Sequence, residues 1–101
     1  MEKTILDTSA MRELFAAISN LKTPREAKMF LRDLCTMAEL KEMATRWQVV
    51  QKILKGATYR KIAQETGAST TTITRVANWL HHGMGGYKLM LSRFHRPRAI
   101  T

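Results

Sequence analysis

Apolar residues in this chain recur at steps of three and four positions, the spacing that places them on one face of an α-helix. Capping residues divide this pattern into six predicted helices. The first is capped by Asp7 or Thr8, and the second begins after Thr23-Pro24, where Glu26 is placed to complete a capping box. No stretch of useful length alternates between apolar and polar residues, so the predicted fold class is all-α.

The third predicted helix is the longest, and it also begins with a capping box, formed by Thr36 and Glu39. Its apolar positions continue to Leu54, and Gly56 supplies a residue that tolerates the left-handed conformation at a helix end. Three shorter helices are expected after it: residues 59–65, capped by Thr58; residues 70–80 or a little beyond, capped by Ser69; and residues 87–94.

The length of 101 residues favours one domain, because a chain this short seldom supports two independent cores. We expect a helical domain over residues 1–94 and a basic tail over residues 95–101. The longest run without charged residues, Val76–Tyr87, is too short and too polar to cross a membrane. The first residues lack the apolar segment of a secretory signal, and the single Cys35 is typical of a reducing compartment. A cytoplasmic location is therefore predicted.

Positive charge is concentrated in the second part of the chain. Residues 1–42 carry seven basic and seven acidic side chains, whereas residues 43–101 carry ten basic side chains and one acidic one, Glu65. The whole formal net charge of +9 therefore arises after residue 42. The electric field of this concentrated positive charge favours a polyanionic partner, either nucleic acid or an anionic membrane surface. Charge alone does not distinguish these two partners.

Residues 59–78 have the pattern of a helix-turn-helix, in which two short helices cross at about 90–120°. Ile62 and Ala63 supply an apolar residue and then a small one at the crossing, and Gly67 supplies a turn residue that tolerates positive φ. Two further apolar positions are placed to anchor the second helix against the first: Ile73 and Val76.

The second helix of this motif carries short polar side chains, which can approach base edges closely in a major groove. Ser69 caps it and leaves backbone N–H groups for a phosphate oxygen, and basic residues on the first helix suit the DNA backbone. The DNA-binding residues predicted on this basis are Arg60, Lys61, Ser69, Thr70, Thr71, Thr72, Thr74 and Arg75. The alternative interpretation is that Gly67 only ends a helix and the threonines form a solvated face. Threonine is a poor helix former, which argues against keeping four of them for stability alone.

The segment from Thr36 to Leu80 resembles the tryptophan repressor (TrpR) family, and most of all its branch of YerC/YecD-type TrpR-like proteins. The residues that carry the resemblance are Thr36, Glu39, Thr45-Arg46, Leu54, Glu65, Gly67-Ala68, Thr72-Ile73-Thr74-Arg75, Asn78 and Leu80. The resemblance implies a six-helix TrpR-like fold in an intertwined homodimer, whose two reading heads face successive major grooves.

In that family a threonine and two arginines line a corepressor pocket, and they correspond here to Thr36, Arg46 and Arg75. Where the tryptophan repressor has a glycine and a serine, this chain has Val76 and Trp79. The valine narrows the slot for an indole ring, and the indole of Trp79 can fill it from within. An ordinary core or dimer-interface role for Trp79 is the other interpretation. We therefore expect a candidate ligand pocket at these five residues, but no cofactor and no tryptophan corepressor; another small ligand stays open.

Neither a metal site nor a catalytic site is expected. His81 and His82 are adjacent, so on a helix their side chains point about 100° apart and do not chelate one ion. Glu65 is the only carboxylate after residue 42, and the sequence has no Gly-rich phosphate loop. An enzyme is therefore not predicted.

These observations predict a cytoplasmic, homodimeric regulator of transcription, acting as a repressor, that binds double-stranded DNA and no membrane. The competing hypothesis is a basic helical adaptor that binds an acidic protein or an anionic surface.

Overall fold

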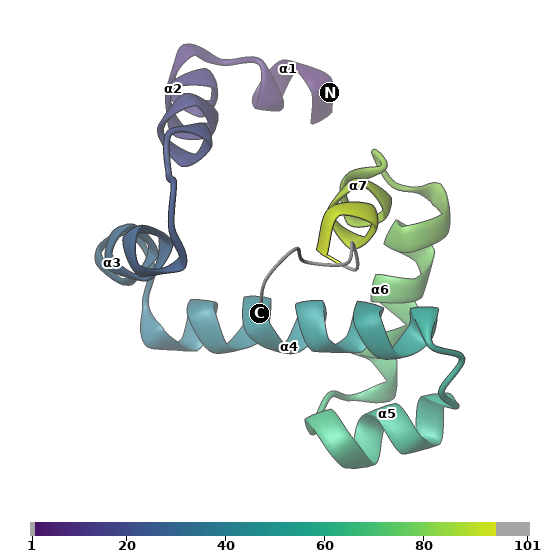
Figure 1. Cartoon of the computed structure of the whole chain (residues 1–101). Coiled ribbons are helices and arrows are strands. Elements are labelled where there is room, and N and C mark those ends of the chain that lie inside the picture. Colours follow the sequence, from purple (N-terminus) through teal and green to yellow (C-terminus); the bar gives the residue numbers. More distant parts are fainter. Residues whose placement is uncertain (1, 95–101) are drawn as a thin grey trace. The chain divides into compact units, whose positions relative to one another are not determined.

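The computed structural model describes residues 2–94, and every regular element within them is an α-helix (Figure 1). The helices are α1 (Glu2–Leu6), α2 (Ser9–Ser19), α3 (Pro24–Leu34), α4 (Met37–Leu54), α5 (Tyr59–Thr66), α6 (Thr70–His82) and α7 (Gly86–Phe94). The predicted all-α fold class is confirmed. The prediction of six helices missed α1, whose five residues are too few for a helical period to repeat. The tail predicted over residues 95–101 lies outside the described residues.

The chain forms two compact units, residues 1–40 and residues 41–101, with the boundary inside α4. The expectation of a single domain over residues 1–94 stays a prediction. Within the described range, none of the helices combines the length and the apolar character that crossing a membrane requires.

Four helices begin at a hydroxyl residue in extended backbone, as the sequence predicts. At each start the side-chain oxygen accepts a hydrogen bond from the backbone N–H group three residues later. This contact satisfies one of the N–H groups that a helix start leaves without a partner. The four capping residues are Thr8, Thr23, Thr58 and Ser69. Of the two candidates for the first of these caps, the structure therefore selects Thr8.

Only one of the two predicted capping boxes is reciprocal. The Thr36 N–H donates to Glu39 Oε1 at 2.8 Å, and the Glu39 N–H donates to Thr36 Oγ1 at 3.1 Å. At α3 the Glu26 N–H donates to Thr23 Oγ1, but the Glu26 carboxylate accepts from the Lys22 N–H at 2.9 Å instead of from the cap residue. The capping box predicted for Glu26 is therefore wrong, because the carboxylate binds the N–H of the residue before the cap.

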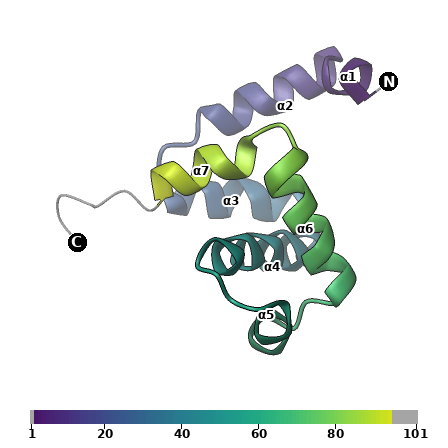
Figure 2. The same cartoon turned by 90° about the vertical axis from the view of Figure 1, so that its right-hand side faces the viewer.

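The core of the second unit joins its four helices. Figures 1 and 2 both show α5 and α7 on opposite sides of α4, with α6 running from one to the other. Eight buried apolar side chains form one cluster there: Val49, Val50, Ile62, Ala68, Ile73, Val76, Leu80 and Leu91. The two residues predicted to anchor the second helix of the motif, Ile73 and Val76, have no exposed surface. This packing fixes which face of α6 points to solvent.

The first unit has apolar stripes but no buried side chain among residues 4–40. On α2 an apolar stripe is present at helical spacing, yet Met11 and Leu14 are only half-buried and Phe15 and Ile18 are exposed. Burial of apolar surface is the main force that stabilises a folded chain. The stripe of α2 therefore has no adequate partner within the described part of one chain.

Gly67 allows a direct test of the turn between α5 and α6. Its φ of +76° lies in the left-handed region, although a Cβ atom there would meet no neighbour within 4 Å. We expect Gly67→Ala to lower the free energy of unfolding by about 1 kcal/mol, because the added side chain disfavours this φ and not because of a clash. Urea titration followed by circular dichroism measures the change.

Gly86→Ala is the matched control, because a Cβ atom at Gly86 also meets nothing within 4 Å and its φ lies outside the left-handed region. That variant should be neutral or more stable by about 0.5 kcal/mol. Equal destabilisation by both substitutions would contradict a left-handed requirement at Gly67.

Candidate nucleic-acid interface

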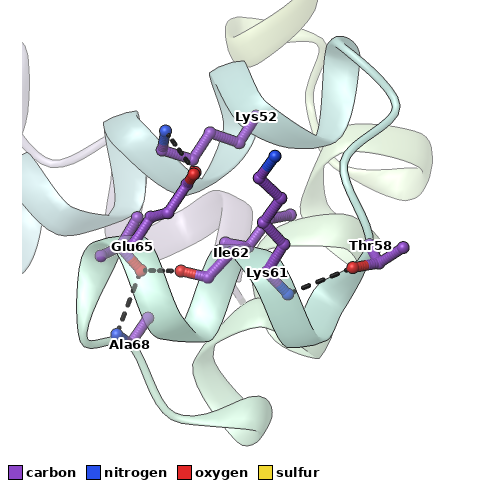
Figure 3. A network of polar contacts seen from close by, with 7 residues as sticks. Lys52, Thr58, Lys61, Ile62, Glu65 and Ala68 are labelled. Atoms are coloured by element: carbon purple, nitrogen blue, oxygen red, sulfur yellow. Dashed lines mark hydrogen bonds and ion pairs between the residues drawn. The ribbon is translucent and has the colours of Figure 1, made fainter.

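The turn between α5 and α6 is held by local hydrogen bonds. The Gly67 N–H donates to the Ala63 carbonyl oxygen at 3.0 Å and closes α5. The Thr66 hydroxyl donates to the Ile62 carbonyl oxygen at 2.7 Å and accepts from the Ala68 N–H at 3.1 Å (Figure 3). Ala68 is buried, so the turn is tied both to α5 and to the core. The two helices therefore form a helix-turn-helix with a defined geometry.

The first two turns of α6 have sharply different faces. Ile73 and Val76 are fully buried, whereas Thr70, Thr71 and Thr74 are exposed to solvent. At 100° per residue the three exposed threonines fall within one third of the helix circumference. They form what we call the threonine face, defined by Thr70, Thr71 and Thr74.

Two of the predicted DNA-binding residues, Ser69 and Thr72, form structural contacts with each other. The Thr72 N–H donates to Ser69 Oγ at 3.1 Å, and the Ser69 hydroxyl donates to Thr72 Oγ1, also at 3.1 Å. Thr72 is half-buried, in contrast to the outward position that the sequence led us to expect. Both hydroxyl groups therefore take part in the cap of α6.

Three of the predicted phosphate-binding residues add exposed positive charge to the two helices of the motif. Arg60 and Lys61 are exposed on α5, and Arg75 is exposed on α6. No ion pair engages any of the three within residues 2–94. Their charges are available to an anionic partner, and a major groove lined by phosphates is such a partner.

An ion pair that the sequence did not reveal connects α4 to α5. Lys52 Nζ lies 2.9 Å from Glu65 Oε1 (Figure 3). The hydrogen bond from Lys52 lowers the pKa of the Glu65 carboxyl group, burial opposes this shift, and the nearby charges of Lys52 and Lys61 add to it. The only carboxylate of the basic part of the chain is thus engaged with a lysine.

The residues of the candidate ligand pocket are divided between the two units. Thr36 belongs to the first unit, where it caps α4. In the second unit the Arg46 guanidinium group lies 5.5 Å from the centre of the Trp79 ring and 2.8 Å from Glu42 Oε2. The first distance is within the range of a cation–π contact. Val76 is fully buried, Arg75 is exposed, and Trp79 is 42% exposed.

Beside this pair lies an aromatic cluster that sequence reasoning missed. The rings of Trp47 and Tyr87 stack at 6.5 Å, and Phe94 meets Trp47 edge-on at 5.5 Å. Burial raises the pKa of the Tyr87 hydroxyl, while the charge of Arg46 opposes the shift. The cluster depends on α4 meeting α7, a contact that no local pattern indicates.

Across residues 2–94, no three His, Cys, Asp or Glu side chains are grouped so that they can hold a metal ion.

Comparison with known proteins gives a consistent result. The sequence model of the family described as "Trp repressor protein" matches residues 9–95. The chain is 43% identical over 81 residues to the protein YerC of Bacillus subtilis (strain 168), which covers 80% of this chain and 78% of that protein.

Solved structures resemble the chain over nearly its whole length. The crystal structure of a TrpR-like protein from Eubacterium eligens ATCC 27750 aligns with a TM-score of 0.87 and 38% identity, covering 94% of this chain and 98% of that one. A second structure, from Staphylococcus aureus, aligns with a TM-score of 0.87 and 41% identity, covering 93% of this chain and 94% of that one.

The Lys52–Glu65 pair predicts a pH-dependent effect of Glu65→Gln. The pKa of Glu65 is lowered from 4.5 in the folded chain, so the stabilisation is present above that pH and is lost as the pH falls through the folded-state pKa. We expect the variant to unfold at a lower urea concentration than the parent at neutral pH. This difference should shrink as the pH is lowered below 4.5.

Glu13→Gln serves as the control, because Glu13 is exposed and forms no ion pair within the described chain. Its urea midpoint should match that of the parent at each pH. A Glu65→Gln effect that is the same at neutral and acidic pH would contradict the assigned role of the ion pair.

Proposed function

The chain belongs to the Trp repressor family, and from this premise we propose that it is a sequence-specific, DNA-binding transcription regulator that acts as a cytoplasmic repressor. The observation that carries the proposal is the threonine face: short, exposed polar side chains at the start of a helix whose other face is locked in the core. In a helix-turn-helix, the start of the second helix is the part that contacts base edges in the major groove.

The predicted residues then have distinct roles. Thr70, Thr71 and Thr74 contact base edges, and Arg60, Lys61 and Arg75 contact backbone phosphates and set the position of α6. Ser69 and Thr72 hold the start of the helix through their mutual hydrogen bonds. The N–H groups at that start are also suited to a phosphate oxygen.

A homodimer is the second part of the proposal. The unburied apolar stripes of the first unit support it, because a second copy of the chain can cover the surface that one copy leaves exposed. Two copies related by a two-fold axis present two threonine faces to one side of a duplex. The half-sites of the operator are then pseudo-palindromic, with centres about 34–36 Å apart.

We also propose that repression needs no tryptophan and no other cofactor. The contact of Arg46 with the ring of Trp79 supports this, because an internal indole already engages the arginine that corresponds to a corepressor ligand in the family. Glu42 forms an ion pair with the same guanidinium group. No catalytic role is proposed for any residue.

The competing proposal is a basic helical adaptor for an acidic protein or an anionic surface. The same free charges at Arg60, Lys61 and Arg75 favour it, but it gives no reason for three exposed threonines on one face. Titration of a random-sequence duplex at two salt concentrations separates the two, because phosphate contacts make affinity fall steeply with salt. Lack of duplex binding even at low salt would favour the adaptor.

The division of roles predicts different effects for two alanine variants. Lys61→Ala should weaken binding to operator and random duplexes alike, and it should reduce the slope of log affinity against log salt by about one unit. Thr71→Ala should mainly reduce the preference for operator over random duplex. Fluorescence anisotropy with both duplexes measures the two quantities, and equal losses on both duplexes for both variants would contradict the assignment.

The dimer is tested by placing a charge in the apolar stripe of α2. Phe15→Glu should shift the sedimentation mass from about twice the chain mass of 11.6 kDa toward that of one chain, because the carboxylate would be buried in the interface. Ala16→Glu, on the opposite side of α2, is the control and should leave the mass unchanged. A parent protein that sediments as one chain at micromolar concentration would refute the dimer.

Isothermal titration calorimetry with L-tryptophan tests the absence of a corepressor. No saturable heat is expected from the parent protein, and its affinity for DNA should be the same with and without the amino acid. Saturable heat at micromolar tryptophan would contradict the proposal.

A further inference from the structure

The exposed surface at the start of α6 has an unusual chemical composition for a DNA-reading helix. Adenine is usually read by Asn or Gln and guanine by Arg or Lys, through paired hydrogen bonds in the major groove. Residues 69–75 contain no Asn, Gln or Lys, and their only long side chain is Arg75. The short side chains exposed after the cap residue Ser69 are therefore threonines, and Arg75 and Asn78 are longer polar side chains exposed farther along α6.

Hydrogen bonds within the helix reduce the number of side chains whose hydroxyl groups are available to base edges. The hydroxyl groups of Ser69 and Thr72 bind each other and cap the helix. Within the described residues, Thr70, Thr71 and Thr74 show no side-chain hydrogen bond. Each of these three exposed side chains carries one methyl group and one hydroxyl group. The threonine face thus offers three methyl groups beside three hydroxyl groups.

A methyl group in the major groove has one natural counterpart. Thymine is the only standard base with a 5-methyl group there, and the methyl group of threonine is one of the apolar groups that contact it. The threonine hydroxyl groups bind either acceptors or donors, so they discriminate less between bases. In the proposed function Arg60, Lys61 and Arg75 bind phosphates, and phosphate contacts carry no direct sequence information.

We propose that the threonine face recognises the 5-methyl groups of thymines, so the DNA bound by this protein carries thymines where α6 enters each half-site. This inference rests on the proposed function and specifies the chemistry by which that same surface selects DNA. The contacts are short and apolar, which explains why the helix keeps three exposed threonines despite their poor helix propensity.

Deoxyuridine provides the test, because it differs from thymidine only by the missing 5-methyl group and keeps the same hydrogen-bonding pattern. A duplex is first selected from a random pool by binding to the full chain, and the selected half-sites should be rich in thymine. Replacing half-site thymines with deoxyuridine should then weaken binding about fourfold for each recognised methyl group that is removed, the value expected for burying one methyl group. Deoxyuridine outside the half-sites is the control and should change nothing.

Two substitutions at one position separate the methyl group from the hydroxyl group. Thr71→Val keeps a methyl group at the same place and removes the hydroxyl, so the ratio of thymidine to deoxyuridine affinities should persist. Thr71→Ser keeps the hydroxyl and removes the methyl, so the ratio at the base that faces residue 71 should fall to about one. Circular dichroism checks that both variants keep the helical content of the parent.

The possible outcomes lead to separate conclusions. If the parent prefers the selected duplex over random DNA but binds its deoxyuridine version equally well, methyl recognition is wrong and the proposed regulator stands. If Thr71→Ser keeps the full ratio while Thr71→Val loses it, the hydroxyl group is the reader and the inference is overturned. If no duplex is bound at low salt, both the inference and the proposed function fail.

Discussion

The packing of the inner face of α6 is the constraint on which the candidate interface depends. Ile73 and Val76 are fully buried with Val49 and Val50 of α4 and with Ile62 of α5, in one cluster. A rotation of α6 by one residue would bring a threonine hydroxyl into this cluster, where an unpaired hydroxyl costs about 1–3 kcal/mol. The core therefore selects one orientation of α6, and that orientation places Thr70, Thr71 and Thr74 in solvent. The turn at Gly67 and the Lys52–Glu65 pair hold α5 in a matching position.

Local features of the helices could be predicted from the sequence, and features that join distant residues could not. The caps at Thr58 and Ser69 and the turn at Gly67 follow from the preferences of single residues, so the motif was located correctly. The contact of Lys52 with Glu65 spans 13 positions in the chain, and that of Arg46 with Trp79 joins α4 to α6. Both depend on how the helices pack. Thr72 shows the same limit at short range, because helical spacing alone does not reveal that its hydroxyl group binds Ser69.

The two units of the chain make different contributions to the proposed regulator. The second unit has its own core and carries the whole formal net charge of +9, so it can present a reading helix and phosphate contacts. The first unit has apolar stripes with no buried residue among positions 4–40, and a second copy is the partner that we propose for them. Under this proposal the apolar part of the chain sets the spacing of two reading helices, and the basic part supplies affinity and selection. The family match, over residues 9–95, includes parts of both units.

The most direct test of the account is cleavage of DNA from a reagent tethered to α6. Cys35 is the only cysteine, so Cys35→Ser combined with Thr71→Cys gives a single attachment point for an iron chelate on the threonine face. On a selected duplex, two zones of strand cleavage should appear, centred about 10–10.5 base pairs apart, as two reading helices in successive major grooves require. The same chelate attached through Ala16→Cys in the Cys35→Ser background should not give this pattern. Cleavage spread evenly along the duplex from the Thr71→Cys protein would contradict the claim that α6 enters the groove with this face.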